Sequence, residues 1–155
     1  EICYRGLQLA KGYLNKPEET AATFLPDGWF RTGDRGYLDE ADFVYFVDRI
    51  KDLIVASGYN LAPVEVENVI YKHPAVAEVA VVGQPDPYRG ETVKAVIAPK
   101  PEYKDKISDQ EIIDHCKSHL ATFKVPRIVE FRDSLPKSAV GKILRRMLRD
   151  EADSG

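Results

Sequence analysis

Two lysines near the end of the chain lie in a loop that suits a mobile positive charge. Lys137 and Lys142 share a stretch with Pro136 and Gly141, and a helix is expected directly after it. A lysine on such a loop can neutralise charge that develops on a carboxylate or phosphate oxygen of a substrate. A surface lysine at a helix entrance gives the same pattern more often, so spacing alone leaves both interpretations open.

An early turn carries the second candidate group. Asp34 lies in the run Thr-Gly-Asp-Arg-Gly at residues 32–36. Its carboxylate can accept hydrogen bonds from sugar hydroxyls, or it can stabilise its own turn. Further on, the charged run 48–52 separates two apolar runs, and a solvated turn is its plain explanation.

Histidines and cysteines give no metal site. His115 and His119 are four residues apart, which places two imidazoles on one helix face, but the sequence positions no third ligand. Cys3 and Cys116 form no CxxC pair, and we expect two free thiols in a reducing cytoplasm. Cys116 is part of the apolar stripe of a helix and is expected to be a small core residue.

The elements that would position these groups alternate between strands and helices. Ser108 and Glu111 form a capping box at the start of one helix. In the last helix we expect a solvated arginine face opposite an inward face that includes Met147. Strands or apolar runs are expected at 2–9, 29–32, 43–47, 53–55, 76–83, 92–99 and 128–131, turns at 33–36 and 84–87, and helices at 17–24, 63–72, 109–120 and 143–149.

These elements predict an α+β fold in two parts. From residue 51 onward the pattern is self-contained and, at roughly 100 residues, long enough to bury one core. The strands of residues 1–50 have open edges and resemble the end of another domain. The chain does not begin with Met, so we expect it to start inside a longer protein.

Composition excludes several classes of function. Lys and Arg total 22 against 25 for Asp and Glu, and the net charge of −3 argues against a nucleic-acid partner. Hydrophobic residues make up 44%, which is typical of a globular protein. No apolar run approaches the ~20 residues that a transmembrane segment needs.

Four motifs, taken in order, resemble the C-terminal part of the adenylate-forming superfamily. This superfamily includes acyl-CoA synthetases, aryl-CoA ligases, luciferases and the adenylation domains of peptide synthetases. The motifs are GWFRTGD at 28–34, DRIKD at 48–52, SGYNLAPVEVE at 57–67 and LPKSAVGK at 135–142. The resemblance implies that 51–155 is a small mobile C-terminal domain, with a short antiparallel sheet packed by helices, and that 1–50 is the β-rich end of a large adenylation domain.

The resemblance also assigns roles to residues in the ATP-dependent step. Asp34 matches the aspartate that binds the ATP ribose hydroxyls, and Arg49 matches the arginine beside that ribose. Asn60 lies where relatives often carry Gln or Arg near the phosphate. Lys142 matches the catalytic lysine that contacts the carboxylate and the α-phosphate while the acyl-adenylate forms. As an exposed lysine it is also a candidate for acetylation, which would remove the charge that this step needs.

Other matched residues belong to the second step. Lys51 falls at the hinge about which the small domain turns between the two half-reactions. The loop formed by Ser57, Gly58 and Tyr59 matches the one that lines the tunnel for the CoA thiol.

The implied function is that of an AMP-forming acyl-CoA ligase. A carboxylate and ATP give acyl-adenylate and pyrophosphate, and CoA then gives the thioester and AMP. The run 62–67, after the motif at 48–52, is more similar to CoA ligases than to peptide synthetases. For the substrate we expect a fatty or medium-chain acid, with an aryl acid as the alternative. A non-catalytic binding module that keeps the fold is the rival from another class.

The resemblance also implies which partners the chain needs, because several parts of the family's active site lie outside residues 1–155. The phosphate loop, the acyl pocket and the Mg2+-binding glutamate of the family belong to the upstream large domain. The full-length enzyme would use ATP, CoA and Mg2+ in the cytoplasm. We expect residues 1–155 to hold none of them alone and to be inactive without that domain.

Overall fold

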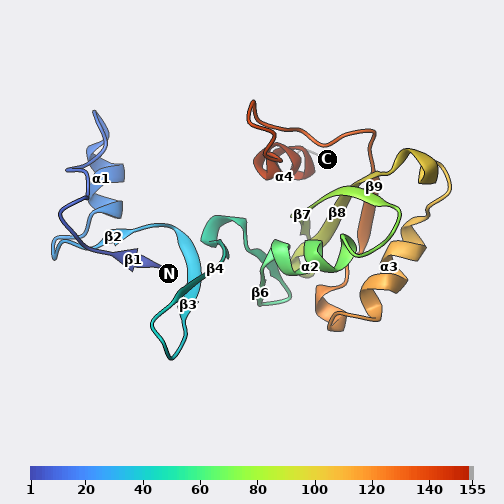
Figure 1. Cartoon of the computed structure of the whole chain (residues 1–155), viewed down its shortest axis with the longest axis horizontal. Helices are drawn as coiled ribbons and strands as arrows, with labels where there is room; N and C mark the ends of the chain where they lie inside the picture. Colours follow the sequence, from blue (N-terminus) through green and yellow to red (C-terminus); the bar gives the residue numbers. More distant parts are fainter. Residues whose placement is uncertain (154–155) are drawn as a thin grey trace. The chain divides into compact units, whose positions relative to one another are not determined.

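A computed structural model describes residues 1–153 and divides the chain into two compact units, Glu1–Lys51 and Asp52–Gly155 (Figure 1). We call them the first and second units and describe each by itself. Among the described residues, every buried hydrophobic side chain lies between Ile54 and Ala152, in the second unit. None of the helices in residues 1–153 has the length and apolar character that crossing a membrane requires.

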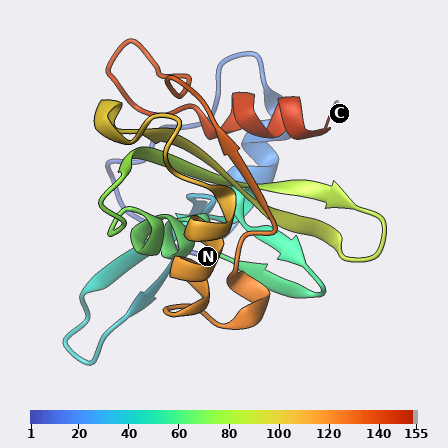
Figure 2. The ribbon, with the colours of Figure 1, turned by 90° about the vertical axis from the view of Figure 1, so that its right-hand side faces the viewer.

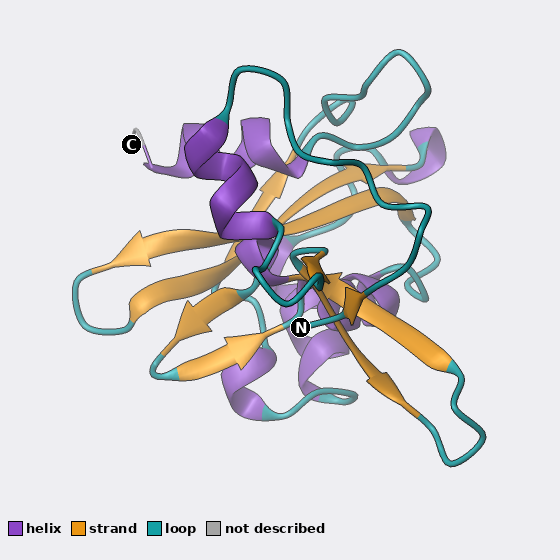
Figure 3. Cartoon of the chain, turned by 90° about the vertical axis from the view of Figure 1, so that its left-hand side faces the viewer, coloured by secondary structure: helices purple, strands orange, loops and turns teal. Residues whose placement is uncertain are grey.

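The first unit consists of one short helix and two two-stranded sheets. Helix α1 begins with a proline, whose missing N–H is not needed in the first turn. Strand β1 pairs with β2 and β3 with β4, both antiparallel, and Figure 3 shows β3 and β4 as a projecting hairpin. The bounds are β1 Cys3–Tyr4, α1 Pro17–Thr23, β2 Phe30–Arg31, β3 Asp34–Leu38 and β4 Val44–Arg49.

Two local predictions for this unit were wrong. Residues 34–38 form strand β3 rather than a loop, because Gly36 lets the strands approach at a bulge. A Cβ on Gly36 would lie 2.4 Å from the carbonyl oxygen of Tyr45. The run 48–52 is not a simple solvated turn either, since Asp48 is buried and its Oδ1 accepts a hydrogen bond from the Arg49 N–H.

The second unit is built on a five-stranded mixed sheet. Strand β8 pairs antiparallel with β7, antiparallel with β5 at its start, and parallel with β9 along its second half. The predicted α+β class, a small sheet packed by helices, is confirmed, and the sheet is antiparallel as predicted except where β9 pairs parallel with β8. The bounds are β5 Ile54–Ala56, β6 Tyr59–Leu61, α2 Pro63–Ile70, β7 Val76–Asp86, β8 Gly90–Pro99, α3 Asp109–Lys117, β9 Ile128–Phe131 and α4 Arg145–Asp153, with short 3-10 turns at Ile50–Asp52, Pro101–Tyr103 and Thr122–Lys124.

Alternation along the central strands sends neighbouring side chains to opposite faces of this sheet. Val79 and Val81 join the cluster that α2 and α3 cover, which includes Ile70, Ile112 and Cys116. The intervening side chains face a second cluster that α4 covers; its buried members are Ala80, Val82, Val96, Ala98, Leu135 and Leu148. Helices therefore pack on both faces, and the predicted core position of Cys116 is confirmed (Figure 2).

The turn expected at 84–87 lies further along the chain. Strand β7 continues through Pro85 to Asp86, and β7 is an edge strand, where a proline removes no inter-strand hydrogen bond. The turn itself follows, where the Asp86 Oδ1 accepts hydrogen bonds from the N–H groups of Tyr88 and Arg89 at 2.9 and 3.0 Å.

The last helix also differs from its prediction. It begins at Arg145 rather than near residue 143, and Met147 is 48% exposed instead of facing inward. Leu148 and Ala152, four residues apart, are the buried side chains of α4. Arg145 and Arg149 are not part of a purely solvated face, because each forms an ion pair with an acidic residue near the start of the second unit, as described below.

Candidate active site

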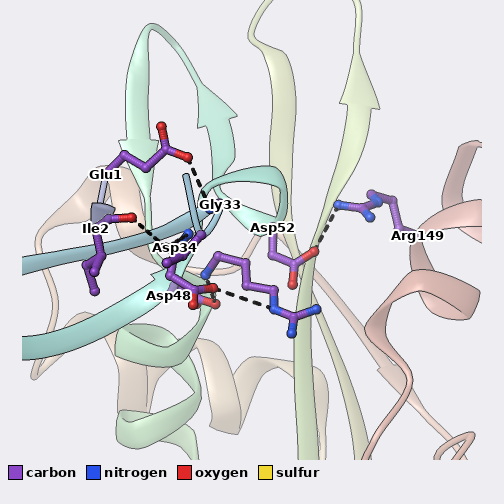
Figure 4. Close-up of polar contacts among 9 residues, drawn as sticks. Glu1, Ile2, Gly33, Asp34, Asp48, Asp52 and Arg149 are labelled. Atoms are coloured by element: carbon purple, nitrogen blue, oxygen red, sulfur yellow. Dashed lines mark hydrogen bonds and ion pairs between the residues drawn. The ribbon is translucent and has the colours of Figure 1, made fainter. Parts of the chain in front are cut away.

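In the first unit, the structure brings Asp34 and Arg49 together. They are directly opposed residues of the β3–β4 ladder, and Arg49 Nε lies 3.7 Å from Asp34 Oδ1. The turn before Asp34 is held by the first residues of the chain: the Gly33 N–H donates to the Glu1 carboxylate at 3.0 Å, and the Ile2 N–H donates to the Asp34 carbonyl at 2.7 Å (Figure 4). Both side chains remain partly exposed, so a carboxylate and a guanidinium are available side by side.

A tight hairpin turn in the second unit presents the next group of candidates. Ser57 and Gly58 link β5 to β6 with φ of 52° and 81°, and positive values at both positions define a type I′ turn. Tyr59 and Asn60 follow in β6, and all four residues are exposed. We call residues 57–58 the Gly58 turn. Its outer side is open, since a Cβ on Gly58 would meet nothing within 4 Å.

The third candidate, Lys142, lies in a closed loop that we call the lysine loop, residues 137–143. Its ends pair as an isolated antiparallel bridge between Lys137 and Ile143. Inside it, the Ser138 N–H donates to the Lys142 carbonyl at 2.8 Å, and the Lys142 N–H donates to Ser138 Oγ at 3.2 Å. The backbone around Lys142 is therefore ordered by its own hydrogen bonds.

The two lysines of this loop differ in what their ammonium groups contact. Lys137 forms an ion pair with Glu78 on β7. Within residues 1–153, the Lys142 ammonium makes no ion pair or hydrogen bond, and the residue is exposed. Spacing alone could not separate the two lysines. Of these two, Lys142 is the one whose ammonium group has no partner among residues 1–153 and is available to a ligand.

The predicted hinge residue lies where the two units meet in sequence. Lys51 is the middle residue of the 3-10 turn Ile50–Asp52 and is exposed, and the second unit begins with the next residue. Asp52 faces the last helix, where Arg149 Nη1 lies 3.4 Å from its Oδ1 (Figure 4). The first residue of the second unit is thus joined to that unit's own C-terminal helix.

Sequence reasoning missed the contacts that support these loops. Tyr59, directly after the Gly58 turn, stacks on Phe123, with ring centroids 4.5 Å apart. Outside the two loops, Glu65 of α2 pairs with Lys124. Glu67, two residues further along α2, pairs with Arg145 directly after the lysine loop. Only the acidic character of α2 was a signal in the sequence, because each partner lies more than fifty residues away.

The histidines singled out in the sequence are the next candidates for a metal site. The rings of His115 and His119 lie close together, with centroids 4.8 Å apart, but α3 ends at Lys117, so His119 does not lie on the predicted helix face. However, no group of three or more His, Cys, Asp or Glu side chains in residues 1–153 is arranged to bind a metal ion.

Comparison with known proteins places this arrangement in a class. The resemblance to adenylate-forming enzymes implied a small α+β unit with a loop at Gly58 and a lysine near its end, and the structure has such a unit. The model of the family described as AMP-binding enzyme C-terminal domain matches residues 65–142, and the chain belongs to this family.

Individual relatives are similar over almost the whole chain. A long-chain-fatty-acid–CoA ligase of Bacillus subtilis (strain 168) is 55% identical over 152 residues, which are 97% of this chain but 26% of that ligase. Among solved structures, the o-succinylbenzoate CoA synthetase MenE from Bacillus subtilis, in complex with the acyl-adenylate OSB-AMP, matches with a TM-score of 0.85 and 40% identity, covering 97% of this chain and 30% of that one.

A second solved structure is similar to this chain to the same degree. ATP-bound MatB from Rhodopseudomonas palustris matches with a TM-score of 0.84 and 38% identity, covering 91% of this chain and 28% of that one. The predicted resemblance is therefore confirmed. The chain spans about a quarter of the length of the relatives that it matches (26% of the first).

Proposed function

We propose that the chain is the C-terminal part of an ATP-dependent, AMP-forming acyl-CoA ligase that acts on long-chain fatty acids. The observation that carries this proposal is the similarity, over almost the whole chain, to a protein named as a long-chain-fatty-acid–CoA ligase. The candidate residues support it, because all of them are exposed or partly exposed and a ligand can reach them.

In the first half-reaction, the fatty-acid carboxylate attacks the α-phosphorus of ATP and pyrophosphate leaves, which gives the acyl-adenylate. Asp34 accepts hydrogen bonds from the ribose hydroxyls, and Arg49 lies beside the same sugar. Lys142 is the catalytic residue that contacts the carboxylate and the α-phosphate. Two anions approach each other in this step, so a cation between them lowers the barrier, and the unpaired Lys142 ammonium is suited to this task.

In the second half-reaction, the CoA thiol attacks the acyl carbonyl carbon and AMP leaves. The Gly58 turn and Tyr59 line the path of the thiol, and Asn60 approaches the phosphate. We propose that the second unit turns about Lys51 between the steps, so that the lysine loop serves the first and the Gly58 turn the second. The short 3-10 turn at Lys51 supports this, because hinges use a few residues at the ends of elements.

The remaining parts of the enzyme belong to the longer protein. We propose that an upstream domain supplies the acyl pocket, the triphosphate loop and the Mg2+ ligands. Residues 1–50 would complete that domain; the exposed aromatic side chains of the β3–β4 hairpin, such as Tyr37, Phe43 and Phe46, support this because another surface could cover them. The cytoplasm, which supplies ATP and CoA, is the proposed location.

The test is carboxylate-dependent ATP–pyrophosphate exchange by the full-length protein. Oleate, octanoate and benzoate are compared at equal concentration. We expect exchange with oleate that exceeds exchange with benzoate by about tenfold or more, a difference of about 1.4 kcal/mol. Exchange with benzoate alone would make the protein an aryl-CoA ligase. No exchange with any acid would contradict the enzyme assignment and favour a binding module.

A further inference from the structure

The lysine loop is fixed to the rest of the second unit at both of its ends. At the start, Lys137 pairs with Glu78 of β7. At the end, the Leu144 N–H donates to the Pro136 carbonyl at 2.8 Å, which closes the loop, and Arg145 follows as the first residue of α4. Lys142 is therefore three residues from a side chain that can anchor it.

Arg145 makes a two-pronged ion pair with Glu67 of α2. Its Nε donates to Glu67 Oε1 at 2.9 Å and its Nη2 donates to Glu67 Oε2 at 2.5 Å. This fork geometry fixes direction as well as distance, which a lysine at the same place could not do. The pair is also well covered, with side-chain exposures of 25% for Arg145 and 9% for Glu67.

Glu67 is itself held in place by the sheet. Its Oε1 accepts a hydrogen bond from the Val81 N–H at 2.9 Å, and Val81 is a fully buried residue of β7. Glu78, the partner of Lys137, lies on the same strand. The two anchors of the lysine loop thus converge on β7, the strand that also contacts α2 and α4.

We propose that the Glu67–Arg145 ion pair is a positioning device for Lys142, so that its loss impairs adenylate formation and spares thioester formation. This inference rests on the proposed function, in which Lys142 serves only the first half-reaction. Neither side chain need touch a substrate: the pair fixes the end of the lysine loop, and the loop fixes where the Lys142 ammonium can reach. A displacement of about 1 Å in a catalytic group can slow a reaction by about a hundredfold.

The matching pair on the same helix provides a control. Glu65 lies two residues before Glu67 and pairs with Lys124, which does not belong to the lysine loop. Its side chain is 49% exposed, so its replacement changes the charge of α2 without loosening Lys142. Glu65→Gln is therefore expected to leave ATP–pyrophosphate exchange unchanged.

The experiment compares the two half-reactions in the full-length protein. Glu67→Gln keeps the size of the side chain and an oxygen for the Val81 N–H, but it removes the charge that Arg145 pairs with. We expect oleate-dependent exchange to fall between about tenfold and a hundredfold. Conversion of premade oleoyl-adenylate and CoA to thioester should change by less than about twofold, and Arg145→Lys should retain more exchange than Arg145→Ala.

A double-mutant cycle shows whether the pair acts through Lys142. In the Lys142→Ala background, Glu67→Gln should lower the residual exchange by less than about twofold, because the group that it positions is already gone. Equal losses in both half-reactions, or a full additive loss in that background, would overturn the proposal and make the pair a general structural contact. If Glu67→Gln does not fold, Arg145→Lys decides by the same comparison.

Failure of the proposed function gives a different result. If wild-type protein shows no exchange with any acid, the function is wrong and the ion pair has no catalytic step to support. If wild-type exchange is normal and Glu67→Gln matches Glu65→Gln, the function stands and the positioning role is wrong.

Discussion

Cys116 illustrates how packing decides the chemistry of a single residue. It lies on the covered face of α3, and burial raises the pKa of its thiol from 9.0 to about 11. The thiolate is the reactive form of cysteine, so a buried thiol with a raised pKa is inert. Cys3, by contrast, is exposed. The two cysteines, both expected from the sequence to be free thiols, therefore differ in reactivity.

We predict that a thiol reagent such as Ellman's reagent modifies Cys3 but not Cys116 in the folded 155-residue chain at neutral pH. Both should react in denaturant. The measurement is the number of thiols released per chain, and Cys3→Ser is the control that should leave no fast thiol. Rapid modification of Cys116 in the folded Cys3→Ser variant would contradict the burial of α3.

The raised pKa of Cys116 also predicts a pH dependence of stability. The folded state retains a proton that the unfolded state releases above pH 9.0, so this contribution is complete below that pH and is lost as the pH rises through about 11. Urea unfolding at several pH values, with Cys116→Ala as the reference, isolates it. A difference between the two proteins that stays constant from pH 8 to about 11 would contradict this pKa.

At the scale of elements, features set by neighbouring residues could be predicted from the sequence, whereas contacts between distant residues could not. The capping box at Ser108 and Glu111 was predicted from a four-residue pattern and is present, with both reciprocal hydrogen bonds. The arginine face of α4 was predicted to be solvated, which holds for the exposed Arg146 but is wrong for Arg145 and Arg149. Their partners Glu67 and Asp52 lie 78 and 97 residues earlier, which no local pattern indicates. Strand β3 was missed for a related reason. Gly36 is needed because the Tyr45 carbonyl of β4 approaches it closely, and this contact cannot be seen in the sequence around Gly36.

The capping box gives a prediction about stability. Ser108→Ala should lower the free energy of unfolding by about 1 kcal/mol, because the N–H of Glu111 loses its acceptor at the start of α3. Ser108→Thr keeps a hydroxyl and should recover most of this loss. Urea unfolding of the three proteins is the measurement, and equal loss in Ala and Thr variants would contradict the capping role.

At the scale of the whole molecule, the hydrophobic core is distributed unequally between the two units. All buried hydrophobic side chains of the described residues belong to the second unit, whereas the first unit leaves several aromatic side chains exposed. The sequence could predict this division, because residues 1–50 show strands with open edges. The sequence motifs singled out Asp34, Arg49 and Lys142 as candidates, and their roles stay predictions. The motifs gave no sign of the contacts that Glu67, Glu78 and Phe123 make beside the loops.

This distribution predicts that residues 52–155 fold without the first unit. A protein of these residues should unfold cooperatively in urea, with a midpoint close to that of the main transition of the 155-residue chain. Residues 1–51 alone should show no cooperative transition. Loss of cooperative unfolding in residues 52–155 would mean that the core depends on the first unit.

The central claim is that Lys142 serves adenylate formation and not thioester formation. The most direct measurement compares wild type and Lys142→Ala in the full-length protein, using oleate-dependent ATP–pyrophosphate exchange for the first half-reaction and thioester formation from premade oleoyl-adenylate and CoA for the second. We predict that exchange falls by about a hundredfold or more, while thioester formation changes by less than about twofold. Unchanged exchange in the Lys142→Ala variant, or an equal loss in both half-reactions, would contradict the role proposed for this lysine.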